Sequence, residues 1–139
     1  MARIDFYVLS QSGAHARHAF ACRLAEKAYR LDNTVHIHAG DNGTVRIIDE
    51  LLWTFRDGSF VPHHCVGDDG LDSPVTIGCN PGSPARDLLI NLSDELPEFF
   101  DHFDRVAELV TNDEDVKIRS RERFLHYREQ GHTLETHKL

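Results

Sequence analysis

The chain has 139 residues, a length typical of one domain that buries roughly two-thirds of its unfolded surface. Its apolar fraction of 40% and charged fraction of 27% are ordinary for a globular protein, and no apolar run approaches the ~20 residues needed to cross a bilayer. The net charge of −8 argues against broad, sequence-independent binding of nucleic acid, which needs many Lys and Arg contacts to phosphate.

The secondary structure expected from the hydrophobic pattern alternates between strands and helices. In chain order, we predict a strand over 4–9, a helix over 14–29, a strand over 35–39, a helix over 44–54, a loop over 67–73, a strand over 74–79, a turn over 80–84, a strand over 87–92, a short helix over 95–103, a strand over 105–110 and a helix that begins at the capping residues 112–115 and ends before Gly131. This alternation predicts an α/β fold: a single Rossmann-like domain, residues 1–139, with a mostly parallel sheet and helices on both faces.

The compartment is expected to be the cytoplasm. Residues 1–9 become polar too soon for a signal peptide. The three cysteines are scattered and odd in number, so they predict no disulfide framework.

The motifs of common catalytic sites are missing from the sequence. The turn after the first strand holds one glycine, Gly13, where a dinucleotide site has three, and there is neither a phosphate-binding loop nor a nucleophile elbow. His63, His64 and Cys65 suggest a metal site, but neighbouring residues of an extended chain point to opposite sides. Two other histidine pairs, His36 with His38 and His15 with His18, have no accompanying Cys-x-x-Cys or His-x-x-x-His motif. We therefore expect no catalytic residue, no cofactor and no metal.

Positive charge gathers near the C-terminus. Residues 117–128 carry a charge of +4, which leaves −12 on the rest of the chain. On a helix, Lys117, Arg121, Phe124 and Arg128 share one face, so three cations surround an aromatic ring. Such a face suits an acidic peptide that ends in a hydrophobic residue. A solvated basic face is the alternative.

Two aromatic residues form a second candidate surface. Trp53 lies roughly 100° from the stripe of Val45, Ile48 and Leu52 on its predicted helix, and Phe60 follows a glycine-containing turn. Aromatic residues at the edge of a core often anchor protein interfaces. The alternative is that both rings pack on the core.

Short sequence fragments, in their order and spacing along the chain, resemble the chi subunit family of bacterial DNA polymerase III holoenzyme over essentially the whole length. The matching fragments are 6–9 (Phe-Tyr-Val-Leu), 51–53 (Leu-Leu-Trp), 59–63 (Ser-Phe-Val-Pro-His), 74–77 (Pro-Val-Thr-Ile), 86–92 (Arg-Asp-Leu-Leu-Ile-Asn-Leu), 121–128 (Arg-Glu-Arg-Phe-Leu-His-Tyr-Arg) and 131–134 (Gly-His-Thr-Leu).

The resemblance implies an α/β accessory subunit of the clamp-loader complex without catalytic activity of its own. It implies a bridge from the small psi subunit of the clamp loader to single-stranded-DNA-binding protein (SSB), whose acidic tail ends in a sequence like Asp-Asp-Ile-Pro-Phe with a free carboxylate. DNA would be contacted only indirectly, and no membrane would be involved.

The resemblance also implies the residues of two sites. Those for the SSB tail are Val110, Lys117, Arg121, Phe124 and Arg128. Those for psi or a psi-like partner, and in some family members for a helicase, are Trp53 and Phe60. Two other classes remain open from the residues alone, an enzyme on the same scaffold and a direct binder of single-stranded nucleic acid.

Overall fold

The computed structural model describes residues 2–55, 58, 60–65, 73–78, 87–97, 99–100 and 103–139. Its elements are, in chain order, β1 (Arg3–Val8), α1 (Ala14–Arg30), β2 (Val35–His38), α2 (Asn42–Thr54), β3 (His63–Cys65), β4 (Val75–Gly78), β5 (Leu88–Asn91), β6 (Arg105–Val110), α3 (Glu114–Glu129) and β7 (Thr133–Lys138).

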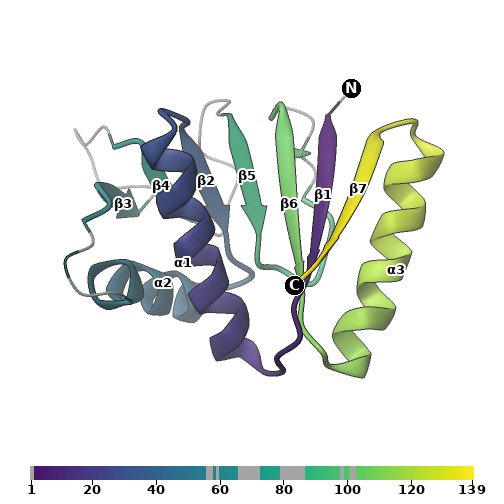
Figure 1. The fold of residues 1–139 in the computed structure, drawn as a ribbon, viewed down its shortest axis with the longest axis horizontal. Helices are drawn as coiled ribbons and strands as arrows, with labels where there is room; N and C mark the ends of the chain where they lie inside the picture. Colours follow the sequence, from purple (N-terminus) through teal and green to yellow (C-terminus); the bar gives the residue numbers. More distant parts are fainter. Residues whose placement is uncertain are drawn as a thin grey trace.

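The strands of the described residues form one sheet of seven in the order β3-β4-β2-β5-β6-β1-β7 (Figure 1). Every neighbouring pair is parallel. The predicted α/β class with a parallel sheet is therefore confirmed. Strands β2, β4 and β5 are buried along their whole length, which explains their continuous apolar runs.

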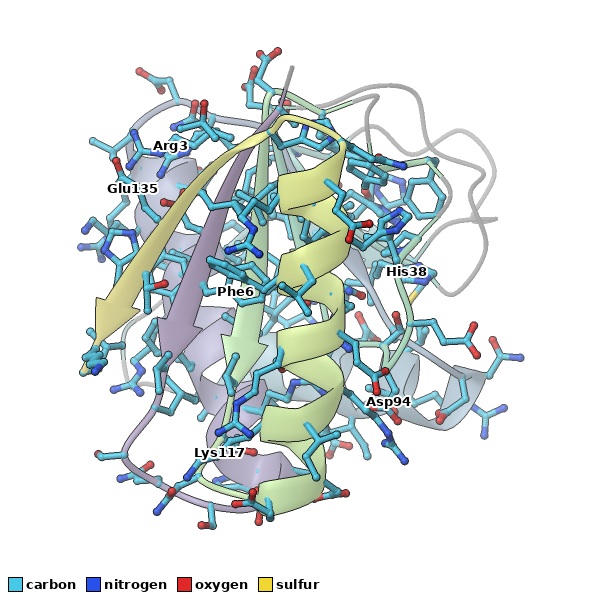
Figure 2. The ribbon with its side chains drawn as sticks, turned by 90° about the vertical axis from the view of Figure 1, so that its right-hand side faces the viewer. Arg3, Phe6, His38, Asp94, Lys117 and Glu135 are labelled. Atoms are coloured by element: carbon cyan, nitrogen blue, oxygen red, sulfur yellow. The ribbon has the colours of Figure 1, made fainter. Side chains whose placement is uncertain are left out.

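Alternate residues of each strand serve two cores on opposite faces of the sheet. The larger core joins α1 and α2 to the sheet and includes Ala21, Ile48 and Ile37. The smaller core lies under α3 and includes Ile4 and Tyr127. Figures 1 and 2 show α1 and α3 on opposite sides of the sheet, so the helices cover both faces as predicted.

Two strands were not anticipated, and both are sheet edges. Strand β3 has three residues, and β7 has the polar sequence Thr-Leu-Glu-Thr-His-Lys, in which only Leu134 and His137 are partly buried. Edge strands often carry charged and polar side chains, because one of their hydrogen-bonding edges is unpaired and such residues discourage pairing with another chain. Their apolar pattern is therefore weak. Strand β7 pairs with β1 in register from Arg3 opposite Thr133 to Val8 opposite Lys138.

The predicted short helix over 95–103 is only partly testable, because Glu98, Asp101 and His102 lie outside the described residues. The residues around them form tight turns rather than an α-helix. The Phe100 N–H donates to the Pro97 carbonyl at 3.2 Å, and the Phe103 N–H donates to the Phe100 carbonyl at 3.3 Å. The predicted loop at 67–73 and turn at 80–84 fall outside the described residues, except for Ser73.

The helix ends partly match the capping prediction. The Asp41 carboxylate accepts the Thr44 N–H at 2.7 Å and so caps α2. Asp113 occupies the N-cap position of α3, but its side chain makes no cap bond there. It instead accepts the Gly13 N–H at 2.9 Å, which fastens the loop after β1 to the start of α3 and lowers the pKa of Asp113. Gly131 ends α3 with a φ of 82°, a conformation that favours glycine.

Candidate functional site

A groove of about 560 Å³ lies between α3 and the sheet, which we call the α3 groove. Its floor is formed by β1, β6 and β7, and its wall by one side of α3. Its lining residues are Phe6, Val8, Val110, Lys117, Ser120, Arg121, Phe124, Leu125, Thr136 and Lys138. In Figure 2, Phe6 points from β1 toward α3, and Lys117 lies near the start of that helix.

The strands and the helix together give the α3 groove an apolar, aromatic lining. The rings of Phe6 and Phe124 lie 5.3 Å apart between centroids and are tilted by 59°. Val110 and Phe6 are buried, whereas Phe124 is only half-buried and Leu125 is exposed. An apolar side chain of a ligand could therefore cover surface that the fold leaves in contact with water.

The arginines of α3 fall into two groups. Arg119 pairs with Asp94 at 3.1 Å, and the buried Arg123 pairs with Glu108 at 3.2 Å. Among ion pairs between described residues, none involves Lys117 or Arg121. One side of α3 therefore carries arginines that form ion pairs within the fold, and another side carries cations that are available to a ligand.

Glu108 fixes the position of α3 on the sheet. This fully buried carboxylate accepts the Tyr127 hydroxyl at 2.8 Å, the Arg123 guanidinium at 3.2 Å and the Asn91 amide at 3.0 Å. Burial, followed by the charge of Glu108, raises the pKa of Tyr127 well above its usual range, so the phenol remains a hydrogen-bond donor. The helix is anchored by this side, and the adjacent side of α3 faces the groove.

The structure brings together four of the five residues predicted for the peptide site. Val110, Lys117, Arg121 and Phe124 all line the α3 groove. Arg128 is exposed on α3 but does not line this groove, and its role stays a prediction.

Sequence reasoning missed the contributions of β1 and β7 to the α3 groove. Phe6 and Val8 alternate with Tyr7 on β1, a signal that points them to one face. Lys138 adds a third cation beside Lys117 and Arg121, but its location depends on the unpredicted pairing of β7 with β1.

Trp53 and Phe60 form a second candidate site, which we call the aromatic patch. Trp53 is 53% exposed, Phe60 is 63% exposed, and their ring centroids lie 5.8 Å apart. The Trp53 ring also contacts His63, whose Nε2 lies 3.1 Å from the Asp49 carboxylate. The alternative in which both rings pack on the core is therefore wrong. The patch lies by edge strand β3, at the opposite edge of the sheet from β7.

One cluster with metal-ligand chemistry occurs among the described residues, formed by Asp5, Glu135 and His137. Its carboxylates already bind arginines: Asp5 accepts Arg105 at 3.0 Å, and Glu135 accepts Arg3 at 2.9 Å. These guanidinium groups supply positive charge where a metal ion would bind. Burial raises the pKa of Asp5, but the bonds from His137 and Arg105 outweigh it, so the net direction is downward. The cluster is best described as an ion-pair network that joins β7 to β1.

In the part of the chain that the structure describes, no helix is both long and apolar enough to span a membrane.

Comparison with known proteins gives one consistent family. The family described as "DNA polymerase III chi subunit, HolC" matches residues 1–135. The chain is 43% identical to the DNA polymerase III subunit chi of Pseudomonas aeruginosa over 140 aligned residues, which cover 100% of this chain and 98% of that protein. It is 32% identical to the subunit chi of Haemophilus influenzae, with 97% of this chain and 96% of that protein covered. For the subunit chi of Escherichia coli, the identity is 31%, with 98% and 97% covered.

A solved structure of similar fold is that of T4 UvsW. The TM-score is 0.68 at 7% identity, and the match covers 99% of this chain but 41% of the UvsW chain. At this identity the likeness concerns the fold alone. The family is established by the sequence relatives: this chain belongs to the DNA polymerase III chi subunits, and so to the proteins of DNA replication.

Proposed function

We propose that this chain is a non-catalytic bridge in bacterial DNA replication, in which the α3 groove binds the acidic C-terminal tail of SSB and the aromatic patch binds psi or a psi-like subunit of the clamp loader. The cytoplasm is the compartment in which such a bridge acts. The observation that carries the proposal is the α3 groove, where Lys117, Arg121 and Lys138 surround an apolar floor in a chain of net charge −8.

The chemistry of the α3 groove suits a peptide with acids and a terminal aromatic residue. Lys117 and Arg121 can bind carboxylates through charge-assisted hydrogen bonds. The ring of the peptide can pack beside Phe124 and over Val110. A free C-terminal carboxylate next to that ring adds a second anion, which fits the additional cation Lys138.

The aromatic patch is suited to a different partner. Two neighbouring rings are exposed in this chain. When a partner covers them, they bury a large apolar area at low entropic cost, which is typical of interface anchors. Because the patch and the α3 groove lie at opposite edges of the sheet, one chain can hold both partners at once. A helicase could occupy the same patch in place of psi.

Retention on SSB-coated DNA tests the bridge. The purified chain should be retained on single-stranded DNA coated with SSB, and it should be lost when SSB lacks its acidic tail. Alone at physiological salt it should bind single-stranded DNA poorly, because three clustered cations cannot match a binding channel that follows many phosphates. It should also show no polymerase, nuclease or ATPase activity. Tight binding to bare DNA in a gel-shift assay would contradict the bridge and favour direct nucleic-acid recognition.

Replacing both aromatic residues of the patch tests the second partner. Trp53→Ala together with Phe60→Ala should abolish co-purification with psi or a psi-like subunit while tail-peptide binding stays nearly unchanged. Because both rings are exposed, the free energy of unfolding should change by less than about 1 kcal/mol. Ile47→Ala, at an equally exposed apolar position of α2, is the matched control and should retain the partner. Loss of both binding activities with a lowered melting temperature would instead show that the rings support the fold.

A further inference from the structure

A second groove lies on the opposite face of the sheet, which we call the α1 groove. It has a volume of about 470 Å³ and lies between β1 and α1, beside Leu139. A smaller hollow of about 240 Å³ shares Tyr7, Leu24 and Lys27 with it and extends the groove toward Leu31 at the end of α1.

The α1 groove repeats the construction of the α3 groove. In the α3 groove, β1 supplies Phe6 and Val8 to the floor, and the helix supplies Phe124 and a pair of cations four residues apart, Lys117 and Arg121. This combination is the one proposed above to bind an acidic peptide with an apolar end.

The same types of residue occur at the α1 groove because successive side chains of β1 point to alternate faces. Here β1 supplies Tyr7, the residue after β1 supplies Leu9, and α1 supplies Phe20 and another pair of cations four residues apart, Arg23 and Lys27. The Tyr7 and Phe20 ring centroids are 5.4 Å apart, and the Arg23 guanidinium lies 5.7 Å from the Phe20 centroid. The result is an aromatic floor with positive charge at its rim.

The positive charge at this rim is open to a ligand. Among ion pairs between described residues, none involves Arg23 or Lys27, and both residues are exposed. The only acid on α1 is Glu26, which is buried and lies 3.8 Å from Arg30. In a chain of net charge −8, a helix whose exposed charges are all positive is suited to an anionic partner.

We propose that the α1 groove binds a second acidic tail of the kind proposed for the α3 groove, with acids at Arg23 and Lys27 and an apolar side chain against Tyr7 and Phe20. The choice of peptide rests on the proposed function, but the groove itself does not. Nucleic acid is the less favoured occupant because the groove is short and the surrounding chain is acidic. One chain would then hold two tails, one on each face of the sheet.

Titration calorimetry tests this proposal with a synthetic peptide that ends in Asp-Asp-Ile-Pro-Phe. The wild-type chain should bind two equivalents, and Arg23→Ala/Lys27→Ala should bind one. Arg121→Ala should weaken the α3 site and retain one equivalent of unchanged affinity at the α1 groove. Arg46→Ala, which removes an exposed cation of α2 outside both grooves, is the control and should still bind two. Amide NMR spectra of the Arg121→Ala variant should shift at residues 7–9 and 20–27 when the peptide is added.

The possible failures are distinguishable. The wild-type chain could bind one equivalent of peptide, with this binding weakened by Arg121→Ala and no amide shifts at residues 20–27. That result would overturn the second site and leave the proposed function intact. Absence of any peptide binding would overturn both. Shifts at the α1 groove caused by a single-stranded oligothymidylate, but not by the peptide, would assign the groove to nucleic acid and overturn the proposal.

Discussion

Arg121→Ala is expected to weaken binding of an acidic tail peptide at the α3 groove by about 1.5–3 kcal/mol, the range for a hydrogen bond to a charged group. Arg121 lies beside Lys117 on the open side of α3, and no ion pair between described residues occupies it. Its loss therefore removes a contact to the peptide without exposing a buried charge. Calorimetry on the tail peptide measures the change, and the affinity for wild type should fall as salt is added.

Arg119→Ala provides the matched control. This substitution removes the same charge from the same helix two residues away, but Arg119 points to Asp94 and does not line the α3 groove. It should leave the affinity of the α3 groove nearly unchanged. Equal losses for Arg119→Ala and Arg121→Ala would show that overall charge, and not the groove, determines binding. Unchanged affinity for Arg121→Ala would remove the tail site.

Arg123→Ala is expected to destabilise the fold by about 3–5 kcal/mol, because it leaves the buried carboxylate of Glu108 without its cation. Arg123 also donates to the Asp94 carbonyl at 2.8 Å and to the Ser120 hydroxyl at 3.2 Å, so two further bonds are lost. Urea unfolding followed by circular dichroism measures the change.

Two variants separate the buried pair from general effects of charge. Arg119→Ala should cost no more than about 1 kcal/mol, because both members of its pair are largely exposed. The double change Arg123→Met/Glu108→Leu should recover part of the loss of Arg123→Ala, since it leaves no buried charge unpaired. A loss of stability under 1 kcal/mol for Arg123→Ala would show that Glu108 does not anchor α3.

The elements that the hydrophobic pattern predicts well are the ones with a buried side. The stripe of Val45, Ile48 and Leu52 on α2 is buried as predicted, and β5 is buried along its length. Helix α3 was predicted from its caps and charge, although its apolar pattern is weak. Its anchor is polar, and the pairing of Arg123 with Glu108 joins residues on separate elements that no local pattern connects.

The residue pattern alone predicted the candidate site only where one helix carries it, and Val110 of β6 was added by the family resemblance. Lys117, Arg121 and Phe124 follow from helical spacing, so their shared face could be predicted. The part of the floor that β7 forms could not be predicted, because β7 is a polar edge strand and its pairing with β1 joins residues 3–8 to residues 133–138. Helical spacing also placed Arg128 on the same face, but that geometry does not say where the groove ends.

The most direct test of the central claim compares two peptides on the wild-type chain. One carries the acidic tail ending in Asp-Asp-Ile-Pro-Phe with a free carboxylate, and the other lacks only the terminal Phe. Immobilised on a resin, the first should retain the chain, and the second should not, because the ring that packs beside Phe124 is removed and the free carboxylate moves back to the preceding Pro. Equal retention by both peptides would contradict recognition of the tail end by the α3 groove.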